Sequence, residues 1–460
     1  MGGKSDMKRF LEPRSVAVIG ASRKLGDGAN VVENLINYGY NGRIYPVNPF
    51  AQEICGIKAY PDVKNLPEDI DLAVILTSRD LVLEIIRECA KKRIKAIIIV
   101  GVGYADADEQ GRKLQLQLVE LARQNGIRIV GPNTFGVANG FTGLYTAFAP
   151  FPIGKIPVGL ISQTGFFFAS TPYFKLVGKA VDLGNACDIS FAEVLEYYEK
   201  DEDVNFIVIY LETIKEGRRF MEVAGRVARK KPIIALRGGK TDQGRQAVMG
   251  HTGALAGSED IYSAVFKKSG IIQADSTTDI EDFIVTFSSL PLMKGKRVGI
   301  MTYPMATGIL SVDACARYGL NVPELSPQTV EKIGRLFPPW APCANPMDLT
   351  AAVFVMGNES KSCFEMIMQA LLIDPEIDAI LFISPALPDY SIYDYSEIVS
   401  RLSRIYNDKP IVSYLYSPDP ERIMARKYED AGGAVVFPSL DRALKALAMM
   451  SNYWEFLNNS

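Results

Sequence analysis

The 460-residue chain contains a single histidine, His251, so any histidine-dependent chemistry must run through that side chain. It lies in the segment Gly250–Gly257, where glycines on both sides indicate a pliable backbone rather than a packed face. A neutral imidazole nitrogen in such a place can accept a transferable group. The alternative is a core histidine, which is less favoured because the segment lacks an apolar core pattern. Zinc sites built on two or three histidines are excluded.

Glu212 follows the apolar segment Val204–Leu211, which is typical of a buried strand. Active sites of parallel α/β folds collect at the carboxyl ends of such strands. A carboxylate there can hold one ring nitrogen of a histidine, fix its tautomer and stabilise the positively charged ring. Glu212 is therefore a candidate functional residue. A solvated strand end is the alternative.

The segment Ser162–Gly165 follows another apolar strand, Val158–Ile161, and precedes a helix predicted to begin at Phe166. Hydroxyl groups and unpaired amides at a helix start favour an anion, because the helix dipole adds to their effect. This segment is a candidate anion site. Taken alone, it is more typical of a plain N-terminal cap.

A third polar turn, Gly20–Ser22, follows the apolar strand Ser15–Gly20 and precedes Gly26 and Gly28. Such a turn lets backbone amides approach a phosphate, which favours nucleotide-type binding over an ordinary tight turn. The spacing is not Gly-x-Gly-x-x-Gly. The next strand ends near Asn48, without the acidic residue that holds an NAD ribose, so an NAD-dependent dehydrogenase is disfavoured.

Short apolar strands alternate with amphipathic helices along the whole chain, which predicts an α/β fold with parallel sheets covered on both faces. We predict three domains, spanning residues 1–136, 137–290 and 291–460. The second and third resemble a diverged repeat: Lys231-Pro-Ile-Ile-Ala235, for example, parallels Lys409-Pro-Ile-Val-Ser413. The third domain has no histidine, so a single active copy would be the second domain.

Composition narrows the class of protein further. There are 50 Lys and Arg residues against 53 Asp and Glu, and this near balance argues against nucleic acid as the main partner. No apolar run approaches the roughly 20 residues of a membrane span, and no signal peptide is evident. The six cysteines are scattered without a Cys-x-x-Cys pair, which indicates reduced thiols, a cytoplasmic location and no metal site.

Several motifs occur together in a specific order. They are Gly20-Ala21-Ser22, Pro46-Val47-Asn48-Pro49, Gly131-Pro132-Asn133, Ser162-Gln163-Thr164-Gly165, Gly184-Asn185, Glu212 and Gly250-His251-Thr252-Gly253-Ala254-Leu255-Ala256-Gly257. This ordered set resembles the α subunit of NDP-forming acyl-CoA synthetases, or ADP-forming acetate–CoA ligases, which are similar to succinyl-CoA synthetase. The resemblance covers essentially the whole chain. It implies a Rossmann-like CoA-binding domain followed by two flavodoxin-like ligase domains.

The resemblance also implies a reaction and roles for the matching residues. Acyl-CoA, phosphate and ADP are interconverted with carboxylate, CoA and ATP through a phosphohistidine at His251, oriented by Glu212. Expected phosphate-binding residues are Ser162, Gln163, Thr164, Gly165, Gly250 and Thr252. Expected CoA-binding residues are Gly20, Ala21, Ser22, Lys24, Val47, Asn48 and Asn133. No bound metal is expected on this chain.

A partner is expected as well, because the chain has no recognisable ADP site. Its segment Gly238–Thr241 resembles the end of a P-loop, but Ile234 stands where that motif needs glycine. The family places ADP and Mg²⁺ on an ATP-grasp β subunit, commonly in an α2β2 assembly. The phosphohistidine must then travel, and we predict that Gly238–Gly257 is a loop suited to such a movement.

The acid itself is less well defined. This chain has Thr164, Phe166 and Thr134 where the family more often has serine, a small residue and cysteine. The run Phe166–Phe168 would narrow the acyl pocket and favour a short acid such as acetate. A succinate or aryl-acid CoA ligase is the alternative within the same class. A CoA-sensing protein without catalytic activity is the alternative from another class.

Overall fold

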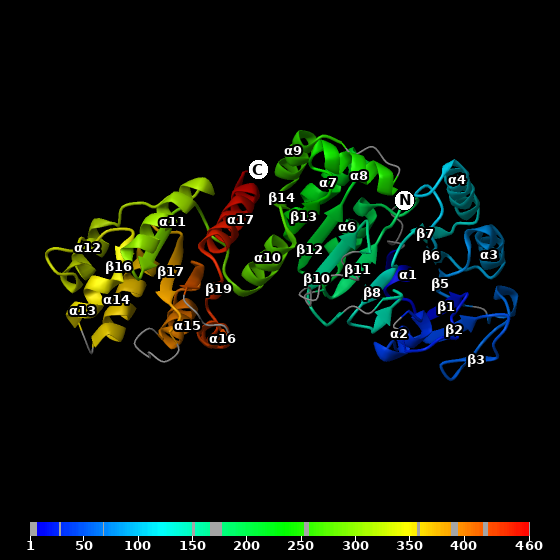
Figure 1. Ribbon diagram of the computed structural model, residues 1–460, viewed down its shortest axis with the longest axis horizontal. Helices are drawn as coiled ribbons and strands as arrows, with labels where there is room; N and C mark the ends of the chain where they lie inside the picture. The colour runs from blue at the N-terminus through cyan, green and yellow to red at the C-terminus, as the bar shows by residue number, and fades with distance from the viewer. Residues whose placement is uncertain are drawn as a thin grey trace. The chain divides into compact units, whose positions relative to one another are not determined.

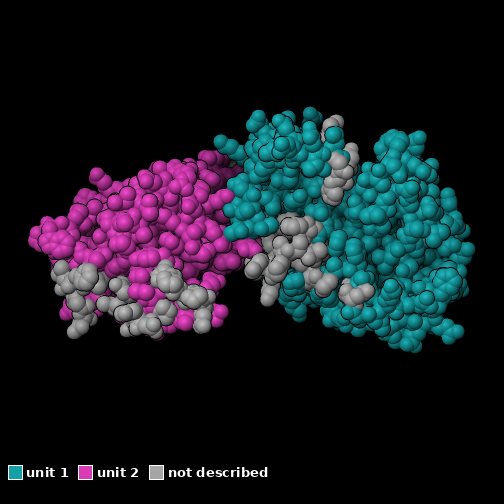
Figure 2. Space-filling model, viewed as in Figure 1, with its two compact units in different colours: residues 1–280 teal, residues 281–460 magenta. Residues whose placement is uncertain are grey.

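Apart from the side chains of 250–252 and 353–356, the computed structural model describes residues 7–26, 29–67, 69–149, 152–165, 177–252, 257–356, 359–387, 394–416 and 422–459. These residues form two compact units, 1–280 and 281–460, each described here by itself (Figure 2). The first unit contains two large sheets and the second contains one (Figure 1). The finer division into three domains stays a prediction.

The first sheet is parallel throughout, in the order β2-β1-β5-β6-β7. Its inner strands are continuous runs of buried apolar residues because both faces are covered. The strands are β1 Ser15–Ile19, β2 Arg43–Val47, β5 Leu72–Ile75, β6 Ala96–Ile99 and β7 Arg128–Val130, with the small hairpin β3 Glu53–Ile54 and β4 Ile57–Lys58. The helices are α1 Met7–Leu11, α2 Val31–Asn37, α3 Arg79–Lys91, α4 Glu109–Gln124 and the 3₁₀ turn Val63–Asn65.

The second sheet has the order β14-β13-β12-β10-β11-β8-β9, in which the first five strands are parallel and the last two are antiparallel. The strands are β8 Val137–Asn139, β9 Leu144–Tyr145, β10 Val158–Ser162, β11 Lys179–Asp182, β12 Phe206–Leu211, β13 Ile233–Arg237 and β14 Ile271–Ala274. The helices are α6 Phe191–Lys200, α7 Gly217–Ala228, α8 Asp242–Thr252, α9 Glu259–Ser269 and α10 Thr277–Ser289.

The third sheet, in the second unit, is again parallel, in the order β16-β15-β17-β18-β19. The strands are β15 Val298–Thr302, β16 Met347–Asp348, β17 Ala379–Pro385, β18 Ile411–Tyr416 and β19 Val435–Phe437. The helices are α11 Met305–Arg317, α12 Pro327–Ile333, α13 Leu349–Met356, α14 Ser360–Ile373, α15 Ser396–Ile405, α16 Ile423–Ala431, α17 Leu440–Asn458 and the 3₁₀ turn Gly334–Leu336.

The parallel part of every sheet has the same topology. Numbered by their place along the chain, the five strands follow the order 2-1-3-4-5 in each case. In such doubly wound sheets the direction of winding reverses between strands 1 and 3, and ligands bind outside the carboxyl ends at that point. In the second sheet these strands are β10 and β12, where Ser162 pairs with Tyr210. The topology therefore brings the segments that follow β10 and β12 together.

One prediction about this region is wrong. The segment Gly238–Gly257 is not a loop throughout, because helix α8 occupies Asp242–Thr252. The Thr241 hydroxyl accepts the Gly244 amide and supports the helix start. The apolar pattern is weak because the helix is mostly exposed, with Val248 as its one buried side chain among the described ones. Sequence periodicity fails for a helix that buries so little.

A buried ion pair lies at the amino end of β11 in the second sheet. Lys179 begins β11 with its side chain 2% exposed. Its Nζ donates to Asp201 at 2.7 Å and to Asp203 at 2.8 Å. The same ammonium group lies 5.4 Å from the ring centre of Phe141 and 5.9 Å from that of Tyr197. Burying this charge is tolerable because Asp201 is buried with it, while Asp203 is partly exposed.

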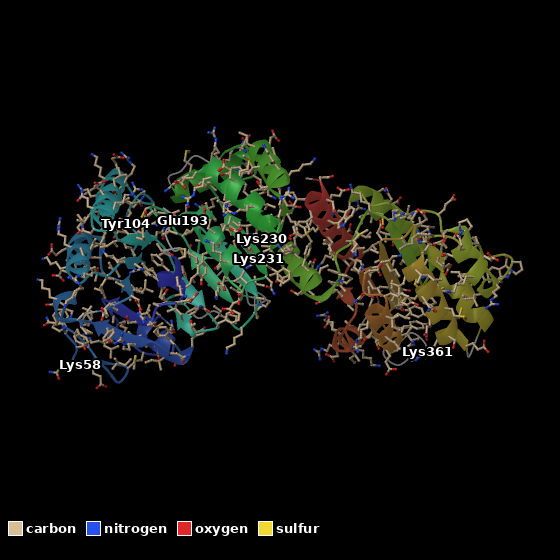
Figure 3. All side chains as sticks on the ribbon, turned by 180° about the vertical axis from the view of Figure 1, so that it is seen from behind. Lys58, Tyr104, Glu193, Lys230, Lys231 and Lys361 are labelled. Atoms are coloured by element: carbon tan, nitrogen blue, oxygen red, sulfur yellow. The ribbon has the colours of Figure 1, made fainter. Side chains whose placement is uncertain are left out.

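We expect Lys179→Met to lower the free energy of unfolding by about 3–5 kcal/mol, because Asp201 is left buried without its cation. Lys230→Met is the matched control, since Lys230 pairs with Glu199 but is 60% exposed (Figure 3). Losing this exposed cation should cost about 1 kcal/mol or less, because Glu199 keeps Arg226 as a partner. Urea unfolding measures both, and equal losses would contradict the distinction.

Candidate active site

Glu212 follows β12 directly and is 5% exposed, so the strand end is buried rather than solvated. The Tyr210 hydroxyl donates to its Oε1 at 3.3 Å. Burial raises the pKa of Tyr210, and the neighbouring Glu212 carboxylate raises it further. Gly238 leaves the room for this pair, because a Cβ there would lie 2.8 Å from the Tyr210 hydroxyl and 3.4 Å from Glu212 Cγ. The site needs glycine at 238 for space.

Gln163 ties the ends of β10 and β12 together. Its Oε1 accepts the amides of Glu212 at 2.7 Å and Thr213 at 2.9 Å, while its Nε2 donates to the Thr213 hydroxyl at 3.4 Å. Its own amide donates to the Tyr210 carbonyl at 3.2 Å. The side chain of Gln163, predicted to bind phosphate, thus fixes the backbone that presents Glu212.

The remaining predicted phosphate residues after β10 shape a tight turn. The Ser162 hydroxyl donates to the Thr164 carbonyl at 2.6 Å and accepts the Thr164 amide at 3.1 Å. A side chain in place of Gly165 would overlap the ring of Phe135. The turn is therefore closely packed, and the helix predicted from Phe166 lies outside the described residues.

The histidine segment is described at its two ends only. Gly250, His251 and Thr252 form the last residues of α8, their side chains lie outside the description, and residues 253–256 lie outside it altogether. The chain is described again from Gly257, whose carbonyl accepts a hydrogen bond from Arg237 at 2.6 Å. Arg237 ends β13, so the far end of the histidine segment is fixed to the carboxyl edge of the second sheet.

Arg237 is a fully buried cation that sequence reasoning missed. It also pairs with Glu259, and its guanidinium carbon lies 3.9 Å from the ring centre of Tyr262. The Tyr262 hydroxyl accepts the Ile214 amide at 3.2 Å, which links this cluster to the segment after Glu212. The Nε of Arg237 is buried and has no hydrogen-bond partner within the described part of the chain. A charged residue ending the apolar strand 233–237 was the signal that could have found it.

Asp182 is a second buried group that the sequence did not single out. Its carboxylate accepts the amides of Phe135 at 2.8 Å and Gly184 at 3.1 Å. Burial raises its pKa to about 7 despite these hydrogen bonds. The two loops that it joins touch closely, since a Cβ on Gly184 would lie 2.2 Å from the Asn133 carbonyl oxygen. Asp182 thereby holds the loop of Asn133, an expected CoA residue, against the second sheet.

The expected CoA residues of the first sheet form a closed turn. The amides of Gly20 and Ala21 donate to the Val47 carbonyl at 2.9 and 3.2 Å, and Asn48 Nδ2 donates to the Ala21 carbonyl at 2.8 Å. Gly20 has a φ of +83°, which favours glycine. Ser22 accepts the Lys24 amide at 3.1 Å. Because the first two amides are already used, a ligand must contact other groups of this turn.

Three such groups lie at or beside the turn. The hydroxyl of Thr77 is buried without a hydrogen-bond partner among the described residues, and its Cγ2 lies 2.9 Å from where a Cβ on Gly20 would stand. The side chains of Arg23 and Lys24 are exposed. An orphaned hydroxyl and two cations at the point where the first sheet reverses fit a phosphate-bearing ligand such as CoA. Sequence reasoning missed Thr77, although it follows a predicted strand.

Among the described residues, no group of three or more His, Cys, Asp or Glu side chains could hold a metal ion. Within the same part of the chain, every helix is too short or too polar to cross a membrane.

Comparisons with known proteins identify the class. The model of a CoA-binding domain matches residues 14–140, that of a succinyl-CoA ligase-like flavodoxin domain matches 155–287, and that of a ligase-CoA domain matches 298–439. These are the domains of CoA ligases. They confirm the predicted fold class of a CoA-binding domain followed by two ligase domains.

Relatives narrow the class to a family. The α subunit of acetate–CoA ligase [ADP-forming] I from Pyrococcus furiosus is 35% identical over 96% of this chain and 97% of its own length. Acetate–CoA ligase [ADP-forming] II from Archaeoglobus fulgidus is 37% identical over 82% of this chain but 57% of its own length. A Ca. Korarchaeum cryptofilum acetyl-coenzyme A synthetase structure with phosphate and ADP has a TM-score of 0.85, 29% identity and 99% coverage of both chains. The chain belongs to the ADP-forming acyl-CoA synthetase family, as its motifs indicated.

The buried carboxylate of Asp182 predicts a pH-dependent stability. Its pKa in the folded state lies above the unfolded value, so the protonated form stabilises the fold at low pH. That contribution should be lost between about pH 4 and pH 7, by roughly 4 kcal/mol. We expect Asp182→Asn to remove this loss.

Denaturant unfolding from pH 4 to 8 checks this expectation. The difference in unfolding free energy between variant and wild type should change steadily up to pH 7 and stay constant above it. Glu222→Gln, at an exposed position on α7, is the control and should leave the profile unchanged. A constant difference for Asp182→Asn would contradict the raised pKa.

Proposed function

We propose that this chain is the α subunit of an ADP-forming acetyl-CoA synthetase, in which His251 carries the phosphoryl group. The observation that supports this most is the placement of Glu212. Its carboxylate is buried where the second sheet reverses its winding. In the same sheet, Arg237 at the end of β13 fixes the far end of the segment that contains the only histidine. Family membership supplies the reaction class.

The proposed reaction has three steps. Phosphate attacks the thioester carbon of acyl-CoA, the C–S bond breaks, and acyl phosphate and CoA result. A ring nitrogen of His251 then attacks the phosphorus, and the carboxylate leaves as the P–O bond to the acyl group breaks. Finally the phosphoryl group passes from the histidine to ADP, which gives ATP and the free imidazole. All steps are reversible.

The residues of this chain position the reacting groups. Glu212, fixed by Gln163 and Tyr210, would accept a hydrogen bond from the protonated ring nitrogen of His251. It would also stabilise the positive charge that develops on the ring. Phosphate contacts are assigned to residues of the turn after β10 and of the histidine segment. These are Ser162, Gln163, Thr164, Gly165, Gly250 and Thr252.

CoA is assigned to the first sheet and the loop of Asn133. Thr77 and Arg23 join the expected residues there, because the orphaned hydroxyl and the exposed cation stand beside the Gly20 turn. The match of residues 14–140 to a CoA-binding domain supports this assignment. The expected set is Gly20, Ala21, Ser22, Lys24, Val47, Asn48 and Asn133.

A partner subunit follows from the same relatives. The Pyrococcus furiosus protein is named as an α subunit, and the longer Archaeoglobus fulgidus chain matches this one over 57% of its length. We assign the nucleotide and its Mg²⁺ to an ATP-grasp β subunit, in an α2β2 assembly. Six free cysteines favour a cytoplasmic location.

His251→Asn should abolish phosphoryl transfer while CoA still binds, because the only imidazole is removed. The measurement is intact-mass spectrometry after incubation of the chain with acetyl-CoA and labelled phosphate. The wild type should gain an acid-labile phosphoryl adduct and the variant none. CoA binding without any adduct on the wild type would favour a CoA sensor instead.

Glu212→Gln should slow phosphohistidine formation by about 10²–10⁴-fold, since the ring loses its orienting carboxylate. Single-turnover labelling with acetyl-CoA and phosphate measures this rate. Glu222→Gln on exposed α7 is the matched control and should behave as wild type. An unchanged rate for Glu212→Gln would remove this residue from the mechanism.

A further inference from the structure

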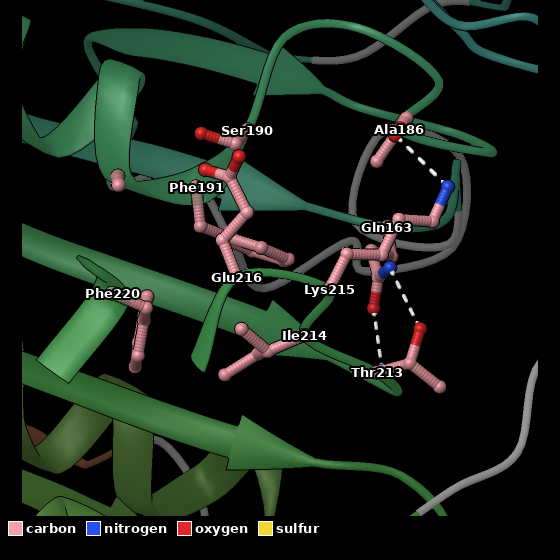
Figure 4. A pocket seen from close by; sticks show the side chains of 10 residues that line it. Gln163, Ala186, Ser190, Phe191, Thr213, Ile214, Lys215, Glu216 and Phe220 are labelled. Atoms are coloured by element: carbon pink, nitrogen blue, oxygen red, sulfur yellow. Dashed lines mark hydrogen bonds between the residues drawn. The ribbon is translucent and has the colours of Figure 1, made fainter. Parts of the chain in front are cut away.

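A narrow pocket opens beside Gln163 and Thr213, the residues that fix the backbone of Glu212 (Figure 4). Its walls come from the connections between β11 and α6 and between β12 and α7, from the first turns of these two helices, and from Gln163 after β10. The lining residues are Gln163, Ala186, Ser190, Phe191, Ala192, Thr213, Ile214, Lys215, Glu216 and Phe220. Apart from Gln163, none of these lining residues has a role in the reaction proposed above.

The interior of the pocket is apolar and small. Phe191 and Phe220 pack edge to face with ring centres 6.1 Å apart, and both are almost fully buried, as is Ala192. Ile214 is partly exposed. The cavity volume is about 30 Å³, whereas one water molecule needs about 10–15 Å³ on the same measure. The pocket therefore has room for a group of about two heavy atoms.

The pocket also lies one loop away from the expected CoA residue Asn133. The amides of Asn185 and Cys187 donate to the carbonyls of Pro132 and Gly131, at 3.0 and 3.2 Å. Ala186, between them, forms part of the pocket wall. A thiol end of CoA that reaches the Asn133 loop would thus lie next to the part of the pocket wall that Ala186 forms.

The charges at the pocket disfavour a second carboxylate. Lys215 is the one cation among the lining residues, and its Nζ already donates to the carbonyls of Asn185 at 2.9 Å and Ala186 at 3.0 Å. Glu216 adds a negative charge to the same wall. The second carboxylate of a diacid would lose its hydration here, and the negative charge of Glu216 would offset the attraction of Lys215.

We infer that this pocket holds the side group of the carboxylic acid and selects short, uncharged monocarboxylates over diacids and aryl acids. The inference rests on the proposed function, and it assigns acyl specificity to Ile214, Phe191, Phe220 and Glu216. The methyl group of an acetyl unit and the ethyl group of a propionyl unit fit this space, while a phenyl ring or the second carboxylate of a succinyl unit does not. It does not depend on Phe166–Phe168, which lie outside the described residues.

Ile214 offers the sharpest test because it is only partly buried and tolerates change. Ile214→Ala should raise the rate of phosphohistidine formation with butyryl-CoA, relative to that with acetyl-CoA, by about tenfold. Ile214→Phe should lower the rate with propionyl-CoA, relative to that with acetyl-CoA, by about tenfold. Ile261→Ala, at a 63% exposed position on α9, is the matched control and should leave both ratios unchanged. Unchanged ratios in both Ile214 variants would overturn the assignment.

Glu216 tests the charge argument. Glu216→Lys should raise the rate with succinyl-CoA relative to acetyl-CoA by about tenfold, because the repelling charge becomes an attracting one. Glu222→Lys, at an exposed position on α7, the helix that Glu216 precedes, controls for net charge. An equal change in both variants would remove the pocket from the selection of diacids.

Binding separates this inference from the proposed function. Calorimetry of the full chain with CoA, acetyl-CoA, propionyl-CoA and butyryl-CoA gives the affinity added by each acyl group, without any turnover. If the wild type forms no phosphohistidine but the added affinity still follows the Ile214 variants, the function fails and the pocket assignment stands. If phosphohistidine forms but neither rates nor added affinity follow the variants, the pocket assignment fails alone.

Discussion

The side-chain amide of Gln163 holds the two strands between which the second sheet reverses its winding. One oxygen accepts the amides of Glu212 and Thr213, so the carboxylate is presented by a backbone that cannot move independently of β10. The topology puts these strand ends side by side, and the amide converts this proximity into fixed geometry. Both the proposed catalytic carboxylate and one wall of the acyl pocket depend on this contact.

The third sheet repeats this turn without its chemistry. Thr302 donates to the Pro304 carbonyl as Ser162 does to Thr164, and the Tyr303 amide donates to the Ile383 carbonyl as that of Gln163 does to Tyr210. The Tyr303 hydroxyl, however, bonds to Tyr395 in the core rather than to a neighbouring strand end. The backbone relation predicted from sequence is thus retained, while the polar bridge is replaced by packing.

The sequence predicted what depends on local pattern. Continuous apolar strands gave the parallel sheets, and Glu212 was found because a carboxylate directly follows such a strand. Helix α8 was missed because a mostly exposed helix has little apolar period. Asp182 and Thr77 were missed for another reason. Asp182 matters through contacts with residues 47 and 48 positions away, and Thr77 through its lack of a hydrogen-bond partner among the described residues. No spacing along the chain records such contacts.

Arg237 sets a limit on how far the proposed phosphoryl carrier can travel. Its guanidinium donates a hydrogen bond to the carbonyl of Gly257, six residues beyond His251. Arg237 is itself held by the ring of Tyr262 and by an ion pair with Glu259. A fully extended chain spans at most about 3.3–3.6 Å per residue, so the six residues from His251 to Gly257 reach roughly 20 Å. While the hydrogen bond between Arg237 and Gly257 holds, His251 cannot pass its phosphoryl group to a nucleotide bound farther than this from Gly257.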